Sequence, residues 1–235
     1  MNNLSQIKKY LSHQFVWVNL LAFVLPLLFK LTPTIILLFA VVVVAQSKFK
    51  IYKYQVKNKV WLFSILYLFY IIGAFYTQHT NELKSELEVK LALLIFPILF
   101  LITKPLPKVV MNKVLLNFVL GCFINTIVSI FKAWSCFEAK GIVECFYSSR
   151  LAFSFHPSYL ALYLNLAVAI LLYFDLHKLR PYHITRWMIW VLIVVFSVFL
   201  VLLSSKMGII GLFLVLLIFF VYHLRQVSWK MTIIK

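Results

Sequence analysis

The sequence is poor in charged residues, and acidic residues are the scarcest of them. Charged side chains make up 12% of the 235 residues, and 6 Asp and Glu stand against 23 Lys and Arg. Soluble domains have about a quarter of their residues charged and about half apolar, whereas 64% of this chain is apolar. Too few polar residues remain to cover one soluble core, so the composition predicts a polytopic membrane protein.

Common motifs of catalytic and cofactor sites are absent. The chain has no GxSxG, P-loop, HExxH or CxxC motif, so we expect no metal and no cofactor. The net charge of +17 would suit nucleic acid. However, the basic residues lie in short loops between apolar runs, which is typical of a membrane-topology signal. No RNA- or DNA-binding pattern is present, so we expect no nucleic-acid partner.

What the chain has in abundance is long apolar runs. A run of about 20 apolar residues can cross a bilayer as a helix. The apolar segments lie at roughly 12–29, 32–46, 60–76, 89–103, 113–134, 153–174, 187–203 and 207–223. They predict an all-α polytopic membrane bundle of about eight transmembrane helices. The fourth segment is the least regular, because Pro97 lies inside it.

Lysine and arginine are concentrated in alternate loops. With the N-terminus cytoplasmic, most of them fall in the two tails and in loops 47–59, 104–112 and 175–186. The positive-inside rule therefore predicts that these loops are cytoplasmic. Every acidic residue except Asp175 falls on the other side, and none lies deep in a span. This counts against a proton- or ion-coupled transporter, which usually buries acids near mid-membrane.

Few polar side chains lie inside the apolar segments. Asn19, Asn117, Asn125 and Asn165 are the deep asparagines, and we expect them to hydrogen-bond between helices. Cys122 is expected to be a small apolar filler.

Cys136 and Cys145 share one loop on the outer side. An oxidising periplasm would allow them to pair as a disulfide. Sequence does not show that their Cβ atoms meet, so paired and free thiols both stay open.

The stretch "SSRLAFSFHPSYLALYLN" marks a first candidate site on the outer side. Pro157 suits the first turn of a helix, which puts His156 at the helix start with Arg150 just before it. Tyr159 lies on the same helix face as His156. Two interpretations stay open. These residues bind a ligand, or Arg150 and Tyr159 are interfacial anchors and His156 caps the helix.

The stretch "LLSSKMG" marks a second candidate site. Ser204 and Ser205 are good N-cap residues, and Lys206 then begins the eighth segment. Unpaired first-turn N–H groups, the helix dipole and an ammonium together suit an anion such as a phosphate-rich lipid headgroup. Because the sixth segment starts on the same side, Arg150 would face the same pocket. The alternative is a lysine that only snorkels to the membrane surface.

"RLAFSFHPSYLALYLNLAVAILLYF" resembles the start of the conserved domain of the O-antigen ligase and O-antigen polymerase family. In that family an arginine precedes a helix that opens with an H-P-x-Y-like or P-N-like turn. The matching residues here are Arg150, His156, Pro157 and Tyr159. "LALLIFPILFL" in the fourth segment is similar to the family's N-terminal half.

"LLSSKMGIIGLFLVLL" resembles the family's small-Ser-Arg-Gly-like motif through Ser204, Ser205, Lys206 and Gly208. The family has arginine where Lys206 stands, and lysine cannot make arginine's bidentate contact to phosphate. The resemblance divides the chain into residues 1–146, with about five spans, and residues 147–235, the start of the conserved domain. Family members continue into a large periplasmic loop, so we expect the chain to be truncated.

The resemblance implies a glycosyltransferase of the bacterial inner membrane whose site faces the periplasm. The enzyme would take a glycan from undecaprenyl diphosphate and pass it to lipid A-core or to a growing polysaccharide. Arg150 and Lys206 would bind the diphosphate, and His156 would hydrogen-bond the diphosphate or the sugar. The supporting residues would be Ser204, Ser205 and Tyr159, and no cofactor is implied.

The catalytic base is unknown, and ligase and polymerase are not distinguished. Whether the chain is an enzyme at all also stays open. The alternatives are a non-enzymatic membrane protein, either a transporter or a lipid-carrier-binding subunit, and an inactive fragment.

Overall fold

The structure is a computed structural model of the chain. It describes residues 16–28, 31–47, 62–77, 83, 87, 90–103, 106–152 and 155–233. Among these residues all regular structure is helical and no strand occurs, as predicted for an all-α chain. Contacts divide the chain into two compact units. Unit 1 is Met1–Gln14 with Pro33–Pro107, and unit 2 is Phe15–Thr32 with Lys108–Lys235.

The described helices of unit 1 are short. They are α2 (Thr32–Ser47), α4 (Leu62–Ala74) and α6 (Ala92–Ile102). Their 16, 13 and 11 residues are fewer than the roughly 20 of a bilayer span. α4 packs against α6, and the Lys90 ammonium lies 4.1 Å from the centre of the Tyr70 ring. Pro97 is buried inside α6, the shortest of these helices.

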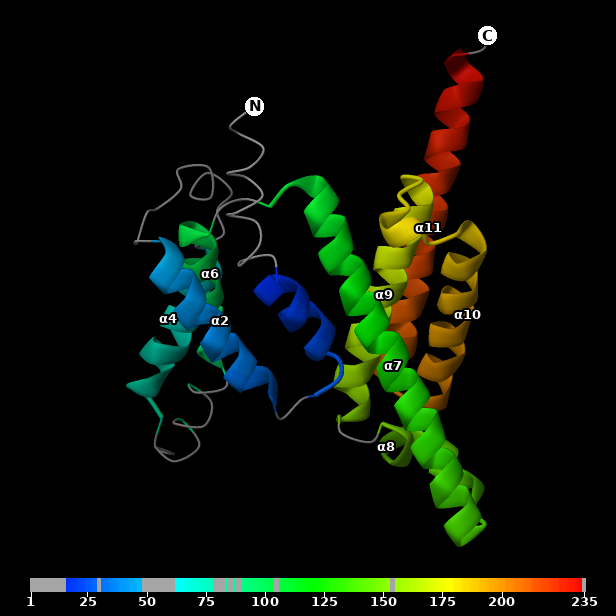
Figure 1. Cartoon of the computed structure of the whole chain (residues 1–235), viewed down its shortest axis with the longest axis horizontal. Helices are drawn as coiled ribbons and strands as arrows, with labels where there is room; N and C mark the ends of the chain where they lie inside the picture. The colour runs from blue at the N-terminus through cyan, green and yellow to red at the C-terminus, as the bar shows by residue number, and fades with distance from the viewer. Residues whose placement is uncertain are drawn as a thin grey trace. The chain divides into compact units, whose positions relative to one another are not determined.

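Unit 2 is built on longer helices (Figure 1). They are α7 (Lys108–Lys140), α9 (Pro157–Leu176), α10 (Arg186–Leu202) and α11 (Lys206–Ile233), with the short α8 (Ser148–Leu151) and the 3-10 turns η2 (Val143–Phe146) and η3 (Pro181–His183). Residues 16–24 are also helical. α7, which ends before residue 146, packs against α9 within unit 2. The division at residue 146 that the resemblance implies stays a prediction.

α9 is the central helix of unit 2, and α7, α10 and α11 all pack against it. Leu160, Leu164 and Leu171 of α9 are fully buried, together with Phe196 and Phe199 of α10. α9 and α11 run in the same direction, while α7 and α10 run in the opposite direction (Figure 1). The starts of α9 and α11 therefore lie at one end of unit 2, together with the end of α7.

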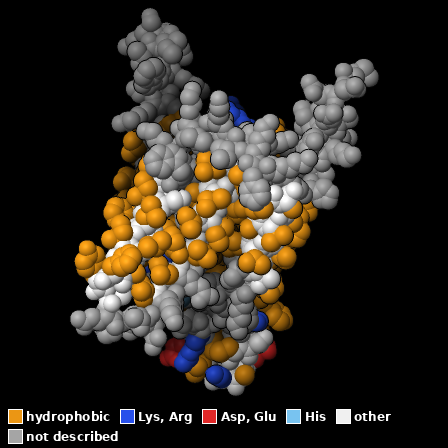
Figure 2. Space-filling view, turned by 90° about the vertical axis from the view of Figure 1, so that its left-hand side faces the viewer, with side chains coloured by type: hydrophobic (Ala, Val, Ile, Leu, Met, Phe, Trp, Pro, Cys, Tyr) orange, Lys and Arg blue, Asp and Glu red, His pale blue; other side chains and the backbone are white. Residues whose placement is uncertain are grey.

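Three described helices are long and apolar enough to cross a membrane, namely α7, α9 and residues Lys206–Leu224 of α11. Only 6% of the apolar stretch of α11 is buried, so most of its apolar surface needs lipid or another apolar partner. Apolar side chains cover the middle of the face in Figure 2, and the charged side chains in view lie toward its ends.

Each predicted apolar segment contains a helix, with different bounds in several cases. α7 and α11 both continue past their predicted ends, since the apolar pattern predicts ends near residues 134 and 223 and the helices continue to Lys140 and Ile233. The end of α7 has a clear local cause. The helix stops where Gly141 adopts a φ of 66° and its N–H bonds the Phe137 carbonyl. A glycine in this left-handed conformation is a common helix end.

Asn117 and Asn165 join helices, as predicted, and Asn125 joins α7 to the turn that follows helix 16–24. Asn117 of α7 donates its side-chain amide to Asn19. Asn125 donates to the carbonyl oxygen of Pro26 at 2.7 Å. Asn165 of α9 donates to the carbonyl oxygen of Gly208 in α11 at 2.9 Å. These bonds stabilise helix pairs that have no hydrophobic force to hold them together in lipid.

Candidate functional site

Small residues bring the starts of α9 and α11 together. A Cβ atom added at Gly208 would stand 2.6 Å from the Cβ atom of Ala161, and one added at Gly211 would stand 2.8 Å from the amide nitrogen of Asn165. Only glycine allows this approach. The first turns of both helices consequently lie at the same end of unit 2, which we call the helix-start end. The sequence predicts this shared side for the sixth and eighth apolar segments.

Lys206 is exposed at the first position of α11. Ser205 before it is buried, with 7% of its surface exposed. Its hydroxyl accepts a hydrogen bond from the Gly208 N–H at 3.3 Å, which is N-cap geometry. Ser204 is exposed in the preceding turn with a φ of 51°. Of the two predicted caps, Ser205 is therefore the one that caps the helix and leads directly into Lys206.

His156 caps α9. The Ser158 N–H donates to His156 Nδ1 at 3.3 Å, and Pro157 occupies the first helical position. His156 therefore caps the helix, and ligand binding by Arg150, His156 and Tyr159 stays a prediction. Because Nδ1 serves the cap, a ligand would bind through Nε2. The exposed Tyr159 ring lies edge-on to the imidazole at 5.9 Å between centroids.

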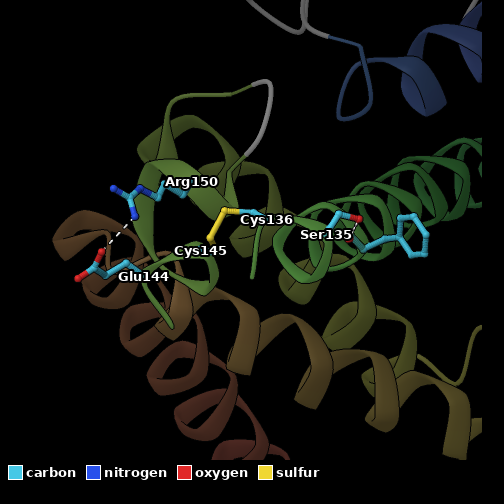
Figure 3. The surroundings of a disulfide bond; sticks show 6 residues. Ser135, Cys136, Glu144, Cys145 and Arg150 are labelled. Carbon is cyan, nitrogen blue, oxygen red and sulfur yellow. Dashed lines mark hydrogen bonds and ion pairs between the residues drawn. A yellow bond between two sulfur atoms is a disulfide. The ribbon is translucent and has the colours of Figure 1, made fainter. Parts of the chain in front are cut away.

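Arg150 lies on α8, just before α9, and points to an acidic neighbour (Figure 3). Its guanidinium donates to Glu144 Oε2 at 3.1 Å, and the two side chains are 51% and 75% exposed. Exposed pairs of this kind contribute about 0–1 kcal/mol. An anionic ligand can therefore compete with Glu144 for the guanidinium.

A disulfide between Cys136 and Cys145 ties the end of α7 to η2 (Figure 3). The Cα atoms are 5.9 Å apart, which is within the usual range for a disulfide. Leu151 and Ala152 are fully buried, so α8 is anchored on its other side. Together these contacts fix the short segment that carries Arg150.

The structure brings together some of the predicted site residues and not others. Ser205, Lys206 and the start of α9 lie at the helix-start end. In the described part of the chain no hydrogen bond or ion pair joins Arg150 to Lys206 or His156. The Glu144 partner of Arg150 was missed, because the two residues belong to different short helices whose relative position sequence does not give.

Groups of His, Cys, Asp and Glu able to hold a metal ion were not found in the described residues. The helix-start end offers the cations Lys206 and Arg150, the imidazole of His156 and the N-termini of α9 and α11. No protein-family model, curated protein or solved structure matches this chain.

Proposed function

We propose that the chain is a polytopic protein of the bacterial inner membrane, with about eight spans and a cytoplasmic N-terminus. The helix-start end of unit 2 then faces the periplasm. Helices in every predicted segment support this arrangement. So does the charge at the other end of unit 2, where Arg180 and Arg186 both pair with Asp175 and exposed Lys178 lies nearby.

At the helix-start end we propose a binding site for the diphosphate of an undecaprenyl diphosphate-linked glycan. The observation that carries this proposal is the exposed Lys206, which opens α11 directly after the capping Ser205 and beside the start of α9. Helix N-termini attract phosphate through their N–H groups and dipoles. Two parallel helices that start side by side add their positive ends, and the ammonium adds a full charge.

The proposed reaction is transfer of the glycan to lipid A-core or to a growing polysaccharide. An acceptor oxygen attacks the anomeric carbon, the bond from that carbon to the diphosphate breaks, and the diphosphate leaves with the electron pair. Lys206 stabilises the charge that grows on the leaving group. Arg150 adds a second cation after exchanging Glu144 for phosphate, and His156 Nε2 hydrogen-bonds the diphosphate or the sugar.

A lipid-carrier-binding subunit without transfer activity is the second candidate. One observation favours it. His156 Nδ1 already accepts the capping hydrogen bond from the Ser158 N–H, so this nitrogen does not serve as the base for transfer. The acceptor hydroxyl must lose a proton during transfer, and none of the named side chains is assigned as its base. Diphosphate binding is common to both candidates, and transfer belongs only to the first.

The test separates binding from transfer. The purified chain in detergent is titrated with undecaprenyl diphosphate and, as the matched control, with undecaprenol, and binding is followed by native mass spectrometry. Preference for the diphosphate supports the site, and equal binding rejects it. Membranes containing the chain, the lipid-linked glycan and an acceptor are then assayed for transfer. Binding without transfer would select the second candidate.

Variants of the Arg150–Glu144 pair refine the same test. Arg150→Gln should weaken diphosphate binding, whereas Glu144→Gln should bind as tightly as wild type or more so, because the arginine is released. If both variants bind like wild type, Arg150 has no part in the site.

A further inference from the structure

α9 and α11 enclose a groove at the end of unit 2 opposite Lys206. Near their starts the two helices touch through Gly208, Gly211 and Ala161. Further along, the facing side chains are bulky and leave a cavity of about 380 Å³. This volume falls within the range of about 300–1,000 Å³ typical of ligand sites. The lining includes Leu172, Leu176, His177, Val215, Phe219 and Tyr222.

The groove is almost entirely apolar, and it ends in a polar rim. Leu172 lies about one turn before the end of α9 and Val215 lies in the first half of α11, whereas His177 lies just past the end of α9. The Tyr173 ring packs on the imidazole of His177 at 4.7 Å between centroids. Exposed Lys178 follows immediately. The apolar chain of an amphipathic ligand would thus contact the apolar lining, and its polar head would lie near His177 and Lys178.

Positive charge gathers in the segment that follows His177. Arg180 and Arg186 share the single carboxylate of Asp175, at 3.7 and 3.1 Å. The Lys113 ammonium of α7 lies 5.2 Å from the centre of the Tyr182 ring, which brings a further cation to the same loop. One carboxylate against these basic side chains leaves this end of unit 2 with net positive charge, which attracts an anionic headgroup.

We infer that this groove binds an anionic phospholipid, with an acyl chain between α9 and α11 and the phosphate headgroup against Lys178 and His177. Charge complementarity selects this occupant. A second copy of the chain would bring its own positively charged end against this one, and like charges would repel. The inference does not rest on the proposed diphosphate site, because Lys206 lies at the other end of unit 2.

The test uses the full chain in phosphatidylcholine nanodiscs with a trace of photoreactive lipid. The probe is phosphatidylglycerol with a diazirine in its acyl chain, and phosphatidylcholine with the same chain is the control. Cross-linked peptides are mapped by mass spectrometry. We expect phosphatidylglycerol to label residues 169–177 and 215–222 at least fivefold more than phosphatidylcholine does.

Two variants sharpen the result. Val215→Trp fills the groove and should abolish the difference between the two lipids. The matched control is Leu214→Trp, at a neighbouring exposed position, and it should keep the difference. Lys178→Gln should lower phosphatidylglycerol labelling about fivefold, equivalent to about 1 kcal/mol, without changing phosphatidylcholine labelling.

The wild-type comparison needs no variant, so a misfolded mutant cannot obscure the outcome. Equal labelling by both lipids would overturn the inference. So would phosphatidylglycerol labelling that persists in a Val215→Trp protein with wild-type helical content. Cross-links from the groove to a second copy of the chain would also overturn it and assign the groove to self-association.

Discussion

Gly208 of α11 faces Ala161 of α9 so closely that a Cβ atom at position 208 would stand 2.6 Å from the Ala161 Cβ atom. We predict that Gly208→Ala pushes the two helices apart. Overpacking of this kind typically costs about 1–3 kcal/mol, so the unfolding temperature in detergent should fall. Circular dichroism during heating provides the measurement. Diphosphate binding should also weaken, because Lys206 moves with α11.

Gly73→Ala is the matched control for this prediction. Gly73 lies in α4, and a Cβ atom there would meet nothing within 4 Å. The added methyl group should leave stability unchanged or raise it, since glycine inside a helix costs about 0.5–1 kcal/mol relative to alanine. The double variant Gly208→Ala with Ala161→Gly should recover much of the loss. A Gly208→Ala protein as stable as wild type would contradict the close packing.

The second prediction concerns Lys206. A charge-assisted contact to phosphate is worth about 1.5–3 kcal/mol, so Lys206→Ala should weaken undecaprenyl diphosphate binding by about one to two decades. Lys206→Arg should retain most of the affinity, and Lys206→Glu should be the weakest because it repels the diphosphate. Titration of the purified variants gives the three affinities. Wild-type affinity in the glutamate variant would show that this lysine only snorkels.

The third prediction concerns the Cys136–Cys145 disulfide, whose cysteines are 9 residues apart. In protein purified without reductant and then denatured, a maleimide should label only Cys122. After reduction it should label all three cysteines. Closing a loop of this size stabilises a fold by about 2–3 kcal/mol in the chain-entropy account. Cys136→Ser should therefore lower the unfolding temperature.

Cys122→Ser serves as the comparison for that experiment, since Cys122 is buried and free. In the denatured, unreduced Cys122→Ser protein, the maleimide should label no cysteine. Three labelled cysteines without reduction would mean that the loop thiols do not pair in the cell.

The fourth prediction concerns topology. In intact cells, a single cysteine at position 144 of a cysteine-free chain should react with an impermeant reagent, and one at position 180 should react only after the membrane is opened. The reason is the excess of lysine and arginine in loop 175–186, which the positive-inside rule assigns to the cytoplasm. Rapid labelling at position 180 in intact cells would invert the proposed orientation of unit 2.

Local signals predicted the starts of α9 and α11 well. Proline at a first helical position and serine as an N-cap act within one turn, so Pro157 and Ser205 could be recognised without any tertiary information. Gly141 was also a local signal for the end of α7. The predicted end near residue 134 rested on the apolar pattern alone and did not take this glycine into account. The interhelical role of the deep asparagines followed from the cost of leaving an amide unpaired in lipid.

Tertiary relationships were harder to predict. The Arg150–Glu144 pair joins residues 6 apart, a spacing that does not match the 3- or 4-residue repeat of helix neighbours. It depends instead on the turn at Ser148, where φ is 50°. Tyr163, which shares a helix face with Tyr159, turns out to pack between Phe118 and Phe155. The α9–α11 groove likewise depends on which helices become neighbours.

The order of protein synthesis gives the α9–α11 contact a further consequence. The ribosome completes α9 well before α11, and Asn165 bonds to a carbonyl oxygen 43 residues later in the chain. Until α11 enters the membrane, the side-chain amide of Asn165 lacks this acceptor, and lipid offers no substitute. Newly inserted α9 therefore carries a side-chain N–H group that gains this acceptor only when α11 arrives.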